Sequence, residues 1–346
     1  MAILAFFLAA CTTAQNISWP GIAADDTMAY LANGAAIYGV HLKDGTEAWR
    51  YPLKAESGKT FYASPVITQD GQLLVGAYAV NPSNLYSLDP QNGTLKWTFS
   101  IAKGRYVGSP LVAGGTIYAP TNDNNLYAIN SDGTLKWQFT AKQELWAAPV
   151  TDGKHIYVAS MDHHLYALSP DNNSKLWDVD LGGAIVSSPV ITTDGAVITG
   201  TLGNEIVAVQ ADNGKVLWRT PTADGVWSTP VLKDNIIYFG DLSGNIFALD
   251  ATSGKVLWKI KPGDAIIGSP ALTPDGLVFP TETGTITAVD FKGSILWSKT
   301  ISGKLYSNLI YKNDMLLVAV KDGTNGLLLV AMDKSGNQLW TYTPAK

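Results

Sequence analysis

The chain has 346 residues, of which 46% are apolar and only 15% are charged, so it can bury a large core. Its formal net charge is −5 at pH 7 and it contains no run of Lys and Arg, which argues against a nucleic-acid partner, because phosphate binding depends on clustered positive charge. The single cysteine, Cys11, excludes any disulfide within the chain.

The first ten residues, MAILAFFLAA, are almost wholly apolar. They are too few to span a bilayer but suit the apolar region of a signal peptide. The following Cys11 completes Leu-Ala-Ala-Cys, which resembles the lipobox of bacterial lipoproteins. This resemblance implies cleavage before Cys11 and a lipid on its sulfur, and the alternative is an incidental thiol. We expect residues 1–10 to be a signal peptide, truncated at its start because no Lys or Arg precedes Lys43, and residues 11–16 to be a lipid-anchored linker. The location would be extracytoplasmic, on the periplasmic side of an outer membrane or at the cell surface.

From residue 17 onward the sequence repeats with a period close to 40 residues. Eight tryptophans mark the repeat, at intervals of 39 to 48 residues: Trp49, Trp97, Trp137, Trp177, Trp218, Trp258, Trp297 and Trp340. Four positions before each stands glycine, or in one unit Asn173, and nine or ten positions before each stands a small residue. Because glycine and asparagine tolerate a positive φ, we expect a tight turn there. We expect each indole to cover the small residue.

Within a unit the pattern is that of short strands. The third unit, for example, divides into SPLVA, TIYAP, NLYAI and TLKWQF, separated by Gly, Asn, Asp and Ser. Four antiparallel strands in each of eight units predict an all-β fold, an eight-bladed β-propeller over residues 17–346. Each unit holds all four strands in order, so we expect the ring to close blade against blade without a shared strand. We expect the propeller to be a monomer.

A small residue followed by proline opens the first strand of most units, and the first unit has Trp19-Pro20 at this place. Three residues before the proline position, aliphatic and aromatic residues alternate around the ring: Ile17, Tyr62, Val107, Trp146, Val186, Trp227, Ile267 and Tyr306. The aromatic members, Tyr62, Trp146, Trp227 and Tyr306, are therefore predicted to form a fourfold rim at the mouth of the central funnel. A docking surface for a partner is one interpretation, because aromatic residues are enriched in binding hot spots. Packing between neighbouring blades is the other.

The segment AlaLeuAspAlaThrSerGlyLysValLeuTrp, residues 248–258, resembles the tryptophan-docking motif of the PQQ-type (pyrroloquinoline quinone) propellers. The likeness recurs over residues 17–343. Together with the eight units and the lipobox, it is similar to the BamB-like family of propeller lipoproteins of the outer-membrane β-barrel assembly machinery. This resemblance implies a non-enzymatic scaffold of the cell envelope with a protein partner, docking on the machinery's periplasmic domains.

The sequence carries little that indicates catalysis. Quinoprotein dehydrogenases that resemble this repeat use a vicinal Cys–Cys pair, a Ca²⁺ held by carboxylates and a catalytic Asp, and the single cysteine excludes the pair. His163 and His164 are adjacent, so strand geometry would point them to opposite faces and away from one shared metal ion. We therefore predict no enzyme activity, no cofactor and no metal. Two alternatives remain open: a small PQQ-dependent oxidoreductase, and a surface lipoprotein that binds glycans or another ligand.

Overall fold

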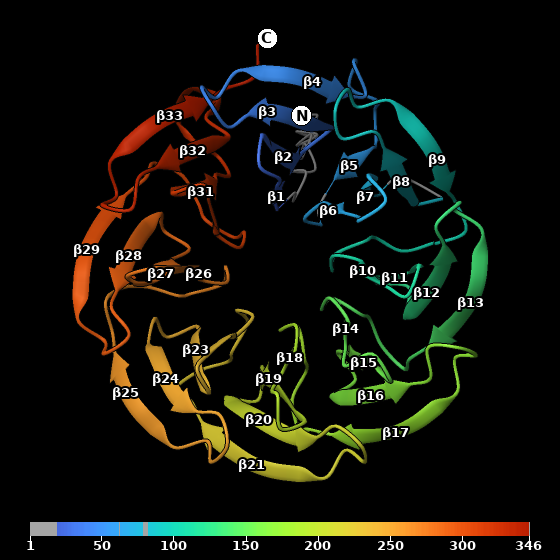
Figure 1. The fold of residues 1–346 in the computed structure, drawn as a ribbon, viewed down its shortest axis with the longest axis vertical. Helices are drawn as coiled ribbons and strands as arrows, with labels where there is room; N and C mark the ends of the chain where they lie inside the picture. Colours follow the sequence, from blue (N-terminus) through green and yellow to red (C-terminus); the bar gives the residue numbers. More distant parts are fainter. Residues whose placement is uncertain (1–18, 62, 79–81, 346) are drawn as a thin grey trace, which may run out of the picture.

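Short runs rich in Val, Ile, Leu and Tyr, separated by Gly, Asn and Asp, form strands along the whole described chain. The computed structural model describes residues 19–61, 63–78 and 82–345. Eight antiparallel sheets are arranged around one central axis, and the last strand of each sheet lies at the outer edge of the ring (Figure 1). The predicted eight-bladed β-propeller is confirmed.

The strands of each blade follow one another in the sequence. Blades one to four comprise β1 (Gly21–Ala24), β2 (Met28–Asn33), β3 (Ala36–His41) and β4 (Glu47–Tyr51); β5 (Thr60–Phe61), β6 (Val66–Ile67), β7 (Leu73–Tyr78), β8 (Asn84–Leu88) and β9 (Leu95–Phe99); β10 (Leu111–Ala113), β11 (Thr116–Pro120), β12 (Asn125–Asn130) and β13 (Leu135–Thr140); and β14 (Val150–Thr151), β15 (Ile156–Ala159), β16 (His164–Leu168) and β17 (Lys175–Asp180). Blades five to eight comprise β18 (Val190–Ile191), β19 (Ala196–Thr201), β20 (Glu205–Gln210) and β21 (Val216–Pro221); β22 (Val231–Lys233), β23 (Ile236–Gly240), β24 (Ile246–Asp250) and β25 (Val256–Ile260); β26 (Ala271–Thr273), β27 (Gly276–Pro280), β28 (Thr285–Val289) and β29 (Ile295–Thr300); and β30 (Ile310–Lys312), β31 (Met315–Ala319), β32 (Leu329–Met332) and β33 (Gln338–Tyr342). Blade two departs from the pattern, because both β5 and β6 pair with β7.

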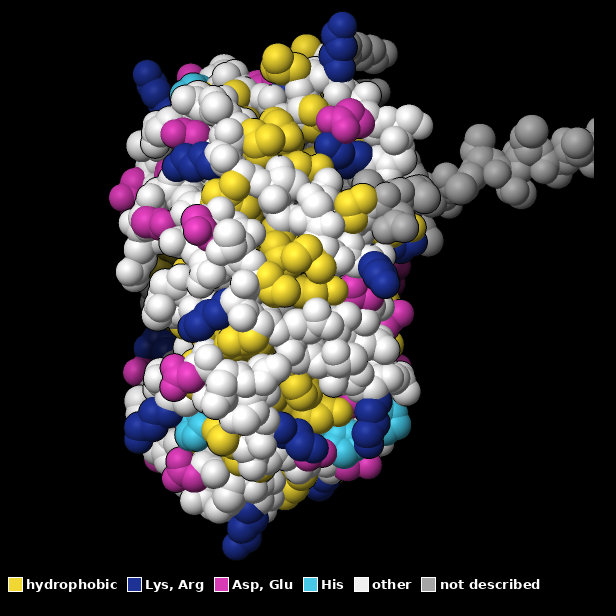
Figure 2. Space-filling view, turned by 90° about the vertical axis from the view of Figure 1, so that its right-hand side faces the viewer, with side chains coloured by type: hydrophobic (Ala, Val, Ile, Leu, Met, Phe, Trp, Pro, Cys, Tyr) yellow, Lys and Arg dark blue, Asp and Glu magenta, His cyan; other side chains and the backbone are white. Residues whose placement is uncertain are grey.

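Each outer tryptophan lies directly opposite the small residue of the third strand. In blade six, for example, Ala248 pairs with Trp258, and the register then shifts so that Leu249 pairs with Val256. Leu257 is the extra residue of this β-bulge, and it is left half exposed. The same shift occurs in every blade. Hydrophobic side chains therefore lie among charged ones on the outer surface, one side of which is shown in Figure 2.

The same indoles join neighbouring blades. Each tryptophan donates a hydrogen bond of 2.8 to 3.1 Å from Nε1 to a carbonyl oxygen in the turn between the last two strands of the next blade. The acceptors, starting from Trp49, are Pro90, Ser131, Pro170, Ala211, Ala251, Phe291, Lys334 and Leu42. The indole also covers the glycine of that turn: a Cβ on Gly93 would lie 2.5 Å from Cε3 of Trp49. The glycine is thus needed both for its positive φ and for the contact between blades.

Asn173 is the one exception at the glycine position. Its φ is 57°, and its side-chain amide donates a hydrogen bond of 2.7 Å to the carbonyl oxygen of Gln138 in the outer strand of the preceding blade. Asparagine thus lacks the conformational freedom of glycine, but its side chain adds a hydrogen bond across the blade boundary.

Replacing Asn173 with alanine is expected to lower the free energy of unfolding by about 1 kcal/mol, because this hydrogen bond is lost while the positive φ remains. Replacing it with glycine should cost less, since glycine adopts the same φ without strain. Urea unfolding of the two variants tests the order, and a glycine variant less stable than the alanine variant would contradict it.

The ring closes between blade eight and blade one without a shared strand, as predicted. Leu31, Leu317 and Leu329 meet in one buried cluster at this seam. The Trp340 indole donates to the carbonyl oxygen of Leu42, and the Asn313 amide donates to that of Asp26, each at 2.8 Å. In the described part of the chain no helix is long and apolar enough to cross a membrane; its one helical segment is the 3₁₀ turn Thr324–Gly326.

Candidate functional site

The segments that lead from the outer strand of one blade to the first strand of the next carry the predicted rim. In each of the seven segments, the residue just before the rim position is at most 1% exposed: Phe61, Tyr106, Leu145, Ile185, Val226, Ile266 and Leu305. In an extended segment successive side chains alternate in direction. Packing between blades is therefore supplied by these buried residues, and at the six rim positions that the structure describes beside them the next side chain lines the axis.

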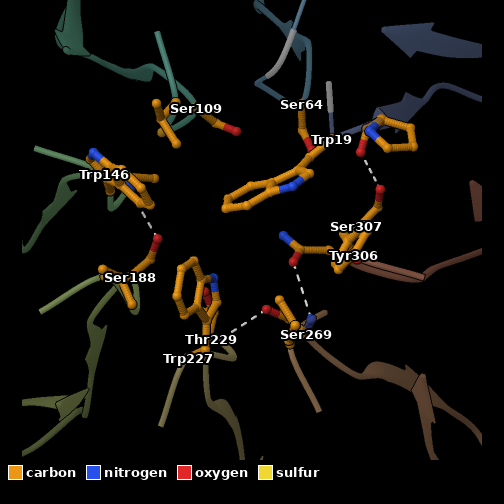
Figure 3. A pocket seen from close by; sticks show the side chains of 17 residues that line it. Trp19, Ser64, Ser109, Trp146, Ser188, Trp227, Thr229, Ser269, Tyr306 and Ser307 are labelled. Atoms are coloured by element: carbon orange, nitrogen blue, oxygen red, sulfur yellow. Dashed lines mark hydrogen bonds between the residues drawn. The ribbon is translucent and has the colours of Figure 1, made fainter. Parts of the chain in front are cut away.

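Trp146, Trp227 and Tyr306 line a central cavity of about 150 Å³ on the axis (Figure 3). They come from the segments that precede blades four, six and eight. The aliphatic rim positions Val107, Val186 and Ile267 line the same cavity. Of the remaining predicted positions, Ile17, Tyr62 and the lipidation residue Cys11 lie outside the described residues.

A fourth aromatic side chain, Trp19, enters this cavity. Its ring centroid lies 6.0 Å from that of Trp146, 5.7 Å from that of Trp227 and 5.9 Å from that of Tyr306. The contacts with the two tryptophans are T-shaped, an orientation that aromatic pairs favour. Trp19 occupies the small-residue position of the first blade, and the repeat does not predict its role at the axis. The signal was present, because it is the one large side chain at that position.

Carboxylates hold the polar ends of two of these rings. The indole Nε1 of Trp146 donates to Glu144, and the hydroxyl of Tyr306 donates to Oε1 of Glu282 at 2.9 Å. Burial raises the pKa of Tyr306 above its ordinary value, and the nearby Lys304 offsets part of that shift. The phenol therefore stays neutral and can donate at physiological pH.

Small polar side chains of the innermost segments line the same cavity as the aromatic rings. Several of them connect neighbouring blades by accepting a backbone N–H from the blade before: Ser188 from Ala148 at 2.9 Å, Ser269 from Thr229 at 2.8 Å, and Asn308 from Ser269 at 3.1 Å. The small residue at this position thus both fits the crowded axis and fixes the spacing of the blades.

Asp162, in the turn between β15 and β16, anchors the segment that carries Trp146. Its Oδ2 accepts the backbone N–H of Lys142 at 3.0 Å and the hydroxyl of Tyr166 at 2.6 Å. Burial raises the pKa of Asp162, but the hydrogen bonds from Tyr166, His164 and Lys142 outweigh burial and hold this pKa below its ordinary value of 3.8. The ionised carboxylate is therefore the form that the fold favours.

Because the pKa of Asp162 is lowered in the folded protein, its contribution to stability is complete above the unfolded pKa and is lost as the pH falls through the folded one. Replacing Asp162 with asparagine should destabilise the protein by about 1 kcal/mol at pH 7, since a charged acceptor is replaced by a neutral one. The difference from wild type should shrink as the pH falls below the ordinary value of 3.8. Urea unfolding at pH 7 and at low pH measures both differences, and a difference that does not change with pH would contradict the assignment.

The two histidines that contact a carboxylate, His155 and His164, each contact a different one. His163 is exposed with a φ of 76°, whereas Nδ1 of His164 lies 2.9 Å from Oδ2 of Asp178 in β17. Nδ1 of His155 lies 2.8 Å from Oδ2 of Asp152. Within residues 19–61, 63–78 and 82–345, no group of three or more His, Cys, Asp and Glu residues is placed to hold a metal ion.

Comparisons with known proteins agree with this architecture. The sequence profile of the family described as outer membrane protein assembly factor BamB matches four overlapping segments, residues 32–151, 81–225, 161–261 and 242–345. A search of curated protein sequences finds no match. Among solved structures, BamB from Moraxella catarrhalis superposes with a TM-score of 0.73 at 17% identity, over 90% of this chain and 92% of that one.

Two other solved propellers are similar in shape. The computationally designed Ika8 protein gives a TM-score of 0.78 at 14% identity, over 91% of this chain and 96% of that one. The C-terminal WD40 domain of Sif2 gives 0.75 at 12% identity, over 89% and 95%. At such low identities these structural likenesses establish the fold alone.

Proposed function

Because the chain belongs to the family of the outer membrane protein assembly factor BamB, we propose that it is a non-catalytic scaffold of the cell envelope. It binds a protein partner with the face on which Trp146, Trp227 and Tyr306 surround the axis. The observation that supports this best is the direction of these three side chains. The residue before each is buried between blades, and the aromatic side chain that follows points toward the axis. Aromatic rings held in this way are typical of interface hot spots.

The lining of the cavity favours binding over chemistry. Its volume of about 150 Å³ is smaller than the roughly 300–1,000 Å³ of pockets that enclose a small molecule. The carboxylates that reach the rings, Glu144 and Glu282, already accept hydrogen bonds from Trp146 and Tyr306. The main chain of a partner would therefore lie across the mouth of the funnel rather than inside it.

The anchor belongs to the same proposal. Lipid on Cys11 would hold the propeller at an extracytoplasmic membrane surface, near envelope proteins under assembly. Replacing Cys11 with serine should release the protein from the membrane fraction, and unchanged fractionation would remove the anchor from the proposal.

Photo-crosslinking in intact cells tests the docking face. A photoreactive residue at Val186 or Ile267, which line the cavity beside the aromatic rings, should trap a component of the outer-membrane assembly machinery. The same residue at Lys292, which is exposed in the turn before β29 at the other end of its blade, is the matched control and should not.

Two outcomes would favour other functions. Capture of labelled polysaccharide in place of a protein would favour a glycan-binding lipoprotein. Turnover of an electron-accepting dye by the purified protein with pyrroloquinoline quinone and Ca²⁺ would favour an oxidoreductase.

A further inference from the structure

Trp19 differs from every residue at the equivalent position of the other blades. Those residues are small, and most are polar: Ser64, Ser109, Ala148, Ser188, Thr229, Ser269 and Asn308. An indole at this place fills space on the axis that the other blades leave open (Figure 3). The small residues of the other seven blades therefore leave a channel along the axis, and the indole of Trp19 fills the mouth of this channel.

Trp19 packs against other aromatic rings and belongs to no strand. Its indole touches Trp146, Trp227 and Tyr306, and its nitrogen makes no hydrogen bond with another described residue. The first strand begins only at Gly21, and the backbone between them is held by the hydroxyl of Ser307, which donates to the carbonyl oxygen of Pro20. The side chain can therefore turn out of the cavity without breaking a strand pair.

The surrounding rings are fixed independently of Trp19. Trp146 and Trp227 also contact each other, with ring centroids 6.0 Å apart. Glu144 holds the indole nitrogen of Trp146 and Glu282 holds the hydroxyl of Tyr306, so both rings keep an anchor when the central ring leaves. Three aromatic walls, two of them anchored by carboxylates, surround one aromatic occupant, so the shape of the site is already matched to a planar ring.

We propose that Trp146, Trp227 and Tyr306 form a socket for an aromatic side chain of the protein partner, and that Trp19 is a tethered occupant that keeps this socket closed until the partner displaces it. The identity of the incoming ring as part of a protein rests on the proposed function. The socket itself rests on the ring that it already holds.

The tether determines how the two rings compete. An occupant attached to the same chain is present at a high effective concentration, so the socket is open only part of the time. The apparent dissociation constant of an external ring is then the intrinsic one divided by the fraction of molecules whose socket is open. Removing the occupant should therefore tighten binding of an external ring. A side chain that was only part of the core would instead leave a site that collapses or a protein that unfolds.

The decisive variant is Trp19→Ser, which restores the small polar residue of the other blades. N-acetyl-L-tryptophanamide, titrated and followed by calorimetry, should bind this variant at least tenfold more tightly than it binds wild type. Trp19→Phe should stay closed and resemble wild type. In Trp19→Ser/Trp227→Ala, one wall is removed and the gain in affinity should disappear. Trp297→Ala, which removes an outer indole remote from the axis, is the control and should bind no more tightly than wild type.

Equal affinity of wild type and folded Trp19→Ser for the probe would overturn the proposal. So would failure of Trp19→Ser to fold, because a displaceable occupant is not needed for folding. Crosslinking from Val186 in cells adds a separate readout: partner capture should increase in Trp19→Ser, and a decrease would show that Trp19 itself contacts the partner. If no protein is captured from either form while the probe binds Trp19→Ser, the proposed function fails but the socket remains.

Discussion

Replacing Trp340 with alanine is expected to lower the free energy of unfolding by about 3–5 kcal/mol and to open the ring at one place, the seam between blades eight and one. The indole covers Gly45 and donates a hydrogen bond to the carbonyl oxygen of Leu42. At every other blade boundary a chain segment joins the neighbours, whereas here side-chain and backbone contacts alone hold them. Losing the indole therefore removes a larger share of what closes this boundary.

Trp258→Ala is the matched control, since Trp258 makes the equivalent contacts with Gly293 and Phe291 within a continuous stretch of chain. Its loss of stability should be similar in size. Amide hydrogen exchange should separate the two variants, because protection of β1–β4 and β30–β33 should fall selectively in Trp340→Ala. Equal loss of protection around the whole ring in both variants would show that the seam is no weaker than the other boundaries.

The second large effect is expected at the glycine beneath an indole. Gly93→Ala should cost about 2–4 kcal/mol, because the new Cβ meets both a positive φ and a packed ring. The φ of Gly93 is 72°, and Cε3 of Trp49 would lie 2.5 Å from the added carbon. Trp49 is only 8% exposed, so it has little room to withdraw.

Gly71, in the same blade, isolates the two causes. Its φ is 75°, but no heavy atom lies within 4 Å of an added Cβ. Gly71→Ala should therefore show the backbone strain alone, about 1 kcal/mol. The difference between the two midpoints of urea unfolding, at equal slope, measures the contact with Trp49. Equal losses would mean that the indole does not depend on the glycine for its place.

The period of the sequence predicts most of the fold because each repeated residue is required by a contact or a turn within its own blade. Ala248 predicts the register of β24 and β25 by leaving space for Trp258, and the structure has that pairing. The second reason for Gly93, the indole of the preceding blade, could not be read from the sequence, because it depends on the distance between two sheets. The split first strand of blade two, β5 and β6, was likewise not predicted.

For the candidate site, the position three residues before each proline predicts which side chains reach the axis, and Trp146, Trp227 and Tyr306 lie there. Trp19 was missed because the repeat assigns a small residue to its position, and a pattern describes what its members share. That the rim binds a partner, that Tyr62 completes it and that Cys11 carries lipid remain predictions.

The seam also determines how the protein can be rearranged. Since every blade is one uninterrupted stretch of chain, joining Tyr342 to Gly21 through a short linker and cutting between any two blades would leave every sheet whole. Duplicating one repeat would likewise add one complete blade rather than parts of two blades. The wheel is thus a modular array, in which circular permutation and gain or loss of single units preserve each building block.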